Sequence, residues 1–201
     1  MPDNAIMKIG YGLYIITSRS GDRHNAMIGN AVMQVGLNPD RLAVSISKTA
    51  YSHDIIRSDG RMNICILSEG APFEVFERFG FSSGRDRDKL AGVELSTSEN
   101  SLAYFPQYSN SFISLEVEDY IDLGSHGMFI CTVTEERVIS SERTMTYSYY
   151  HENVKPKPAA KPGPKGWVCS ICGYVYEGEE LPDDFICPWC NHGKEAFEPL
   201  K

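Results

Sequence analysis

The sequence predicts a mainly β protein in two parts, a larger barrel and a small C-terminal ribbon that holds a metal ion. Three observations predict this fold class. Short apolar or alternating runs recur along the first part, with few helical patterns between them. A stretch rich in proline and lysine then interrupts the chain at residues 153–165. Four of the six cysteines follow it as two Cys-x-x-Cys pairs.

Five segments of the first part are predicted as strands, because each combines apolar or β-branched residues with a turn signal or a period-two alternation. They are residues 11–18, 42–47, 62–67, 112–120 and 128–133. A polar, glycine-containing turn signal follows the first of them at residues 18–22. Residues 124–127 carry a second signal, which is typical of a hairpin connection.

Two short helices are expected between these strands. The first covers residues 52–58 and places two adjacent isoleucines on one face. The second covers residues 71–79, begins with Pro72 near its first turn and repeats phenylalanine at every third position. Many strands with few, short helices favour a barrel over a doubly wound sheet.

The proline-rich stretch predicts the domain boundaries. Residues 153–165 hold four of the eleven prolines and four lysines, a composition that disfavours both a helix and a central strand. We therefore expect a domain at 1–152, a linker at 153–165 and a second domain at 166–201. The linker can reach roughly 40 Å if it is extended like polyproline. A surface loop inside one domain is the alternative, but structureless loops of this length are uncommon.

Composition and charge exclude several classes of function. The formal charge of −8 argues against a generic nucleic-acid binder, which needs a basic surface. No apolar run of about 18 residues predicts a membrane span. The first residues lack the basic and apolar regions of a secretory signal, so we expect a cytoplasmic protein. Thiols stay reduced in the cytoplasm, which favours a metal site over disulfides.

Cys169, Cys172, Cys187 and Cys190 are the predicted metal ligands. Each Cys-x-x-Cys pair can lie on a tight turn, and two facing turns place four thiolates at the corners of a tetrahedron. This geometry suits zinc or a single iron, and the spacing alone allows both. The other two cysteines, Cys65 and Cys131, lie in apolar strands and are expected in the core.

The C-terminal part resembles the rubredoxin family. The resemblance rests on residues 166–178, 181–190 and 193–198, which surround the cysteines with tryptophan, tyrosine and phenylalanine. It resembles the short rubredoxin modules that are fused to other redox domains, because few residues separate the two cysteine pairs. The resemblance implies one iron held by four thiolates and transfer of single electrons. A structural zinc ion remains the alternative.

The first part has no nucleotide-binding fingerprint of the common kinds. Gly10 and Gly12 match the start of G-x-G-x-x-G, but Ile15 occupies the third glycine position and the stretch does not join a strand to a helix. No G-x-x-x-x-G-K-[ST] motif is present either. A nucleotide cofactor would therefore need another kind of site.

Several segments of the first part resemble the flavin reductase-like family, which binds FMN on a split β-barrel. The matching segments are residues 25–34 with Pro39, 42–48, 58–67 and 82–89. Together with the fused rubredoxin module, they make the whole chain resemble the high-molecular-weight rubredoxins.

The resemblance implies four groups of FMN contacts. They are Asn30, Ala31, Val32 and Gln34 along the ring and ribityl chain; Ser45, Ile46 and Ser47 on the next strand; Tyr51 and His53 at the start of a helix, near the phosphate or ribityl chain; and Ser83, Gly84, Arg85 and Lys89 at the phosphate. Plain structural roles stay open: the serines can face solvent, His53 can be a helix-surface residue, and Lys89 can be a solvated charge.

The resemblance also implies a function. NAD(P)H would reduce FMN, and FMN would pass single electrons through the iron to a flavodiiron nitric oxide or oxygen reductase. We expect a homodimer, with the aromatic residues of 73–81 and 147–150 as candidate contacts. Two alternatives remain. The ribbon could hold zinc and serve as an interaction module, or the chain could accept electrons from another protein instead of NAD(P)H.

Overall fold

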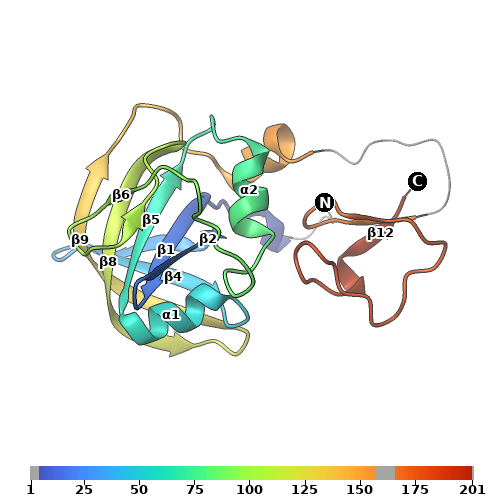
Figure 1. Cartoon of the computed structure of the whole chain (residues 1–201), viewed down its shortest axis with the longest axis horizontal. Helices are drawn as coiled ribbons and strands as arrows, with labels where there is room; N and C mark the ends of the chain where they lie inside the picture. The colour runs from blue at the N-terminus through green and yellow to red at the C-terminus, as the bar shows by residue number, and fades with distance from the viewer. Residues whose placement is uncertain (1–4, 157–165, 201) are drawn as a thin grey trace.

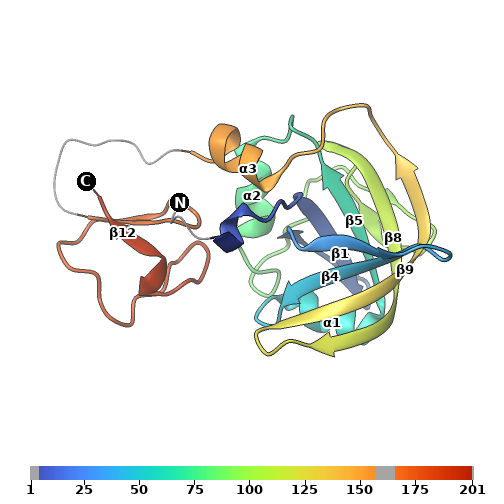
Figure 2. The same cartoon turned by 180° about the vertical axis from the view of Figure 1, so that it is seen from behind.

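The computed structural model describes residues 5–156 and 166–200 of the chain. It contains a seven-stranded sheet that curves into a barrel and a separate three-stranded sheet near the C-terminus. Figures 1 and 2 show the barrel and the C-terminal ribbon at opposite ends of the molecule, with α2 on the side of the barrel that faces the ribbon. This mainly β architecture agrees with the fold class predicted from the sequence.

The strands of the barrel domain are β1 (Tyr14–Ser20), β2 (Arg23–Gly29), β3 (Val32–Gly36), β4 (Arg41–Ser47), β5 (Arg61–Leu67), β6 (Ser96–Thr97), β7 (Ala103–Tyr104), β8 (Ser109–Asp122) and β9 (His126–Val138). The ribbon has β10 (Trp167–Cys169), β11 (Val175–Tyr176) and β12 (Phe197–Pro199). The helices are α1 (Tyr51–Asp59), α2 (Phe73–Gly80) and α3 (Tyr147–Tyr149), the 3-10 helices η1 (Ala5–Lys8) and η3 (Lys194–Ala196), and the π-helical turn η2 (Tyr150–Val154).

The barrel is split between two strands that follow each other in the sequence. The strand order is β2-β1-β5-β8-β9-β4-β3, and every neighbouring pair is antiparallel. The two edge strands, β2 and β3, are therefore joined only by Asn30 and Ala31. Residues that the sequence assigns to a cofactor thus lie at the opening of the barrel.

Strands β1 and β5 carry apolar residues on both faces because both faces are covered. Ile15 and Cys65 belong to one buried cluster, while their chain neighbours Ile16 and Ile64 belong to another. Successive side chains point to opposite faces of a strand, so a strand that is buried on both sides is continuously apolar. This explains why residues 15–16 and 64–67 are apolar in succession.

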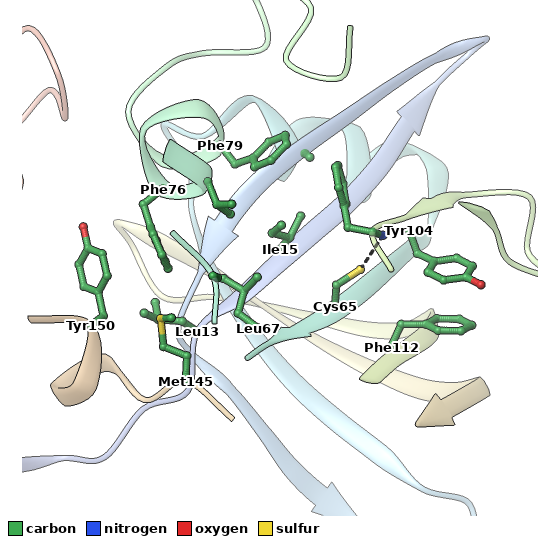
Figure 3. Close-up of a cluster of buried hydrophobic side chains, with 14 of the residues drawn as sticks. Leu13, Ile15, Cys65, Leu67, Phe76, Phe79, Tyr104, Phe112, Met145 and Tyr150 are labelled. Atoms are coloured by element: carbon green, nitrogen blue, oxygen red, sulfur yellow. Dashed lines mark hydrogen bonds between the residues drawn. The ribbon is translucent and has the colours of Figure 1, made fainter. Parts of the chain in front are cut away.

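Each of the two main helices closes one of these clusters. Helix α1 contributes Ile56 to the cluster around β4 and β9. It ends at Gly60, which adopts a left-handed φ of 75° that glycine tolerates without strain, and its N–H binds the Ile56 carbonyl. Helix α2 contributes Val75, Phe76 and Phe79 to the other cluster, which Figure 3 shows between α2 and the sheet.

Tyr150 belongs to the same cluster as α2. Its ring lies 4.4 Å from that of Phe76 between centroids, and its side chain is 5% exposed. Phe76, Phe79 and Tyr150 are therefore core residues of one chain, while Phe73, Tyr147 and Tyr149 are only partly buried against that core. A dimer contact at these residues stays a prediction.

Replacing Phe112 with alanine is expected to destabilise the barrel domain by about 3–5 kcal/mol. Phe112 is fully buried and stacks on Tyr104, with 4.0 Å between ring centroids and 12° between planes. Urea unfolding of the variant would measure the loss. Val138→Ala, at a side chain that is 78% exposed, is the control and should change stability by less than about 0.5 kcal/mol. A loss below about 1 kcal/mol at Phe112 would contradict the packing described here.

The predicted linker lies mostly outside the described residues, since 157–165 are not among them. Its first residues continue the barrel domain, because η2 runs to Val154 and crosses the expected boundary at 152. The helical turn ends where Lys155 becomes extended, one residue before Pro156. A residue that precedes proline disfavours helical backbone angles, so the proline sets this end.

The ribbon has a small core of its own. Strand β10 pairs with both β11 and β12. Three of the four clustered cysteines, together with Leu181, Ala196 and Phe197, form its buried centre. Within residues 5–156 and 166–200, no helix has the length and apolar character needed to cross a membrane.

Candidate functional site

Two Cys-x-x-Cys turns with the same backbone pattern build the metal site. In the first turn, Gly173 N–H donates to the Cys169 carbonyl at 2.8 Å, and in the second, Asn191 N–H donates to the Cys187 carbonyl at 2.9 Å. Gly173 and Asn191 have φ values of 83° and 57°. Glycine and asparagine both tolerate this left-handed region. The sequence therefore places one such residue in each turn, at the point where the backbone must reverse.

The four thiols predicted as ligands meet in one place. Their Sγ atoms all lie within 4.8 Å of one another, with 3.6 Å between Cys169 and Cys190 and 3.4 Å between Cys172 and Cys187. A tetrahedron with metal–sulfur bonds of about 2.3 Å has sulfurs roughly 3.8 Å apart. The thiol cluster therefore fits one four-coordinate metal ion, as the spacing of the cysteines predicts.

Cys172, Cys187 and Cys190 differ in pKa because the thiols lie close together and because backbone amides donate to some of them. The Cys190 thiol, with help from the Tyr174 amide, lowers the pKa of Cys172 to about 5. Burial raises the pKa of Cys187 to about 11, and the pKa of Cys190 rises mainly because of its contact with Cys172. Cys172 is thus the thiol of this group that gives up its proton most easily, and the thiolate is the form that binds a metal.

An aromatic shell surrounds the thiols. The Phe185 ring lies 4.7 Å from Tyr176 and 5.2 Å from Phe197 between centroids, and Tyr174 meets Trp189 edge-on at 5.5 Å. Cys190 is the least buried ligand, and its neighbour Trp189 is 41% exposed. The second cysteine turn therefore gives the metal site its most accessible side.

A second group of predicted site residues meets at the N-terminal end of α1. The Arg85 guanidinium lies 5.0 Å above the Tyr51 ring and donates to the Thr49 carbonyl at 3.3 Å. The Thr49 hydroxyl lies 2.9 Å from that of Ser47. The structure thus joins residues of β4, α1 and the loop after α2, and Thr49 connects them although the sequence analysis did not single it out.

Gly84 lets the loop after α2 approach this group closely. A Cβ at Gly84 would lie 2.0 Å from Asn25 Oδ1 and 3.3 Å from the Tyr51 ring, so no larger residue fits without a shift. Ser83 Oγ accepts a hydrogen bond from the Arg85 amide at 3.1 Å. A cation, hydroxyls and a helix N-terminus in one place are donors of the kind that a phosphate needs.

Lys89, which was predicted at the phosphate, forms hydrogen bonds within the protein. The Lys89 ammonium is buried and donates to the carbonyls of Phe79 and Ser82 at 3.0 and 3.1 Å, which ties the loop to the end of α2. Burial, with a smaller effect of Arg87, lowers the pKa of Lys89 to about 8. Its contact with a phosphate stays a prediction; Arg85 is more exposed than Lys89, and its guanidinium pairs with the Asp54 carboxylate at 3.1 Å.

His53 also has protein partners on both ring nitrogens. Its Nδ1 lies 3.0 Å from Asp54 Oδ1, and its Nε2 lies 3.1 Å from the Tyr120 hydroxyl. The ring packs edge-on against Phe129. In this arrangement His53 fastens α1 to the β8–β9 hairpin.

The remaining predicted residues lie along the split of the barrel. The Ser45 amide donates to the Ala31 carbonyl at 2.9 Å, which holds the connection between β2 and β3 against β4. The side chain of Ile46 is fully buried, so only its backbone could meet a cofactor. Gln34 is exposed and donates its amide to Asp40 at 2.9 Å. Asn30 and Val32 are half-buried at the same opening.

Two known families match different parts of the chain. Residues 6–157 match the model of the flavin reductase like domain, and residues 167–198 match that of the rubrerythrin, rubredoxin-like domain. Together the matches span the barrel, the ribbon and both groups of candidate residues.

Individual relatives match the whole chain or its larger part. A high molecular weight rubredoxin from Moorella thermoacetica is 35% identical, and the match covers 100% of both chains. A ferric-chelate reductase (NAD(P)H) from Archaeoglobus fulgidus is 31% identical over 78% of this chain and 93% of its own. Among solved structures, the flavin reductase PheA2 superposes with a TM-score of 0.61 at 25% identity, over 73% of this chain and 93% of that chain.

Proposed function

Because this chain belongs to the flavin reductase-like family and ends in a rubredoxin-like domain, we propose that it oxidises NAD(P)H at a bound FMN and delivers single electrons through an Fe(Cys)₄ centre to another protein. The fused domains support flavin-dependent electron transfer as the general activity. The observation that carries the proposal is the four-thiol cluster in the same chain as the flavin domain. One chain would thereby combine a flavin, which takes up two electrons, with a metal centre that carries one.

The residues around Arg85 and the split barrel would hold the flavin. Arg85, Ser83 and the N-terminus of α1 suit the phosphate, and the half-buried residues at the opening between β2 and β3 suit the ring and ribityl chain. When bound, FMN accepts two electrons from a nicotinamide and can release them one at a time. The protein supplies the placement and the shielding of these groups.

Iron is the metal that this role requires. A tetrahedral set of four thiolates binds iron or zinc, but zinc has no redox chemistry. A carrier beside a flavin domain needs a metal that changes its oxidation state by one electron. Iron content and the visible absorption of the purified protein would distinguish the two metals.

The acceptor is proposed to be a flavodiiron nitric oxide or oxygen reductase in the cytoplasm. Residues 166–201 contain two basic and seven acidic side chains, which gives this domain a net charge of −5. Complementary charge speeds protein encounter and orients the partners. A basic docking surface on the acceptor, with an association rate that falls as salt rises, is therefore expected.

Replacing Arg85 with glutamine is expected to weaken FMN binding about tenfold, since a charge-assisted hydrogen bond is worth about 1.5–3 kcal/mol and Arg85 is partly exposed. Riboflavin, which lacks the phosphate, should bind wild type and variant equally. Fluorescence titration would measure both affinities. Arg137→Gln, at a guanidinium paired with Glu135, is the control. Equal losses for FMN and riboflavin would contradict a phosphate role for Arg85.

A homodimer is proposed through the open edge of the barrel. Met33, Val35 and Leu37 are 61%, 47% and 73% exposed on β3 and the turn after it. Unpaired strand edges with exposed apolar side chains favour association with another chain. Light scattering of the flavin-loaded protein should give about 45 kDa, twice 22.5 kDa. A mass near 22.5 kDa at micromolar concentration would contradict the dimer.

Anaerobic titration with NADH and NADPH tests the proposed function directly. With either or both nucleotides, the iron bands should bleach first, because the flavin passes its electrons on to the iron, and the flavin absorption should bleach as more nucleotide is added. Bleaching by a reduced donor protein alone would place this chain downstream of another enzyme. A colourless metal site that contains zinc would contradict the electron-transfer role.

A further inference from the structure

The flavin domain contacts the first cysteine turn through Lys155. This residue follows η2, and its Nζ donates to the carbonyls of Ser170 and Ile171 at 2.9 and 2.5 Å. These two residues lie between Cys169 and Cys172 in the sequence. A Cβ added at Gly173 would lie 3.9 Å from Lys155 Cε, so the end of the lysine side chain passes close to the turn.

The second cysteine turn meets the flavin domain through an aromatic pair. Phe81, which follows α2, stacks on Trp189 with 6.4 Å between ring centroids and 17° between planes. Trp189 lies between Cys187 and Cys190 in the sequence. Both turns of the metal site are thus contacted from the same domain, and Figure 1 shows α2 and the end of η2 on the side that faces the ribbon.

This contact has the character of a reversible one. A cleft of about 530 Å³ remains between α2 and the ribbon, lined by charged side chains of α2 and of residues 87–89, with Trp189 opposite. Open, polar contacts of this kind are typical of domains that separate and return.

The positive charge of Lys155 affects the relative stability of the oxidised and reduced forms of the metal centre. A ferric ion with four thiolates carries a net charge of −1, and the ferrous form carries −2. A nearby cation therefore stabilises the reduced form more than the oxidised form. The Lys155 ammonium donates to the carbonyls of the two residues between Cys169 and Cys172, so its charge lies close to the thiol cluster.

We infer that Lys155 is a positioning residue of the flavin domain that docks the metal domain through the first cysteine turn and favours the reduced state of the metal while docked. Phe81 and Trp189 form the second contact of the same docking surface. The inference rests on the proposed electron transfer from flavin to metal. The step is a one-electron reduction of the ferric centre, in which the flavin is oxidised by one electron and no bond is formed or broken.

The test compares Lys155→Met with Lys155→Arg in the full chain loaded with iron and flavin. Each variant is poised with redox mediators at one potential, and the ratio of reduced to oxidised iron is read from its absorption. Lys155→Met should lower this ratio about tenfold, which corresponds to about 59 mV for a one-electron couple. Lys155→Arg keeps the charge and should stay within about threefold of wild type.

Two further variants distinguish an effect of docking from an effect of removing any positive charge near the metal. Lys194→Met removes a lysine of the metal domain that pairs with Asp183 at 2.6 Å, and should change the ratio less than twofold. Phe81→Ala changes no charge, so a lowered ratio there would support an effect of docking. An unchanged ratio in Phe81→Ala would overturn the docking part of the inference.

The remaining outcomes are also decisive. An unchanged ratio in Lys155→Met, or an equal loss in Lys155→Arg, would overturn the role of the lysine charge. Because mediators reduce the iron without NAD(P)H, this result would leave the proposed function intact. Failure of both nucleotides to reduce the flavin, with the Lys155→Met shift present, would instead overturn the proposed donor alone.

Discussion

Replacing Cys172 with alanine is expected to abolish metal binding while the barrel domain stays folded and keeps its flavin. Cys172 is 2% exposed and its Sγ lies 3.4 Å from that of Cys187, so no water or other side chain can replace it without rearrangement of the turn. The ribbon should lose its fold as well. A domain this small depends on its metal, and structural metal ions supply about 10–16 kcal/mol to comparable small domains.

Metal content per chain and visible absorption would measure this loss. Cys131→Ala is the matched control, because Cys131 is an equally buried cysteine on β9 within the barrel. The control should retain one metal ion per chain. A Cys172→Ala protein with unchanged metal content would contradict the ligand assignment.

Cutting the linker is expected to slow iron reduction by the flavin by about a hundredfold to a thousandfold at micromolar protein. A tether of this length supplies a roughly millimolar effective concentration, and cleavage turns the transfer into a bimolecular step. The docking contacts through Lys155 and Phe81 leave an open cleft, so they are not expected to hold the cut domains together at this concentration.

A protease site inserted among residues 157–165 allows the comparison within one protein. Iron reduction is followed after rapid mixing with NAD(P)H, before and after cleavage. The uncut protein with the same insertion is the control, and flavin reduction should proceed at the same rate in both. Equal rates of iron reduction before and after the cut would show that the tether has no role in this step.

The strands with apolar character were predictable, and those without it were not. Residues 42–47 and 112–120 alternate as half-buried strands do, and the structure places β4 and β8 there. Strand β2 reads Arg-His-Asn-Ala-Met-Ile-Gly and β3 is largely exposed, so neither has an alternation that marks one buried face. Among the described strands, each pairs only with its neighbour in the sequence, β2 with β1 and β3 with β4, so a hairpin partner places these strands where their own residues carry no strand pattern.

The metal ligands were predictable because their spacing alone encodes the geometry. The flavin residues depended on resemblance, since small polar residues on strands have no local signature. The roles of Lys89 and His53 show the limit, because their partners are a helix end and a distant hairpin. Lys155 contacts residues 170 and 171, which lie on the other side of the linker in the sequence, so no local sequence pattern predicts this contact.

The reach of Lys155 from one domain into the other couples the position of the ribbon to its electron content. By thermodynamic reciprocity, if docking favours the reduced centre by some factor, reduction favours docking by the same factor. The ribbon therefore leaves the flavin domain less readily after it gains an electron than before. An acceptor must compete with this internal surface, and a basic face gains in that competition because the reduced domain carries one more negative charge.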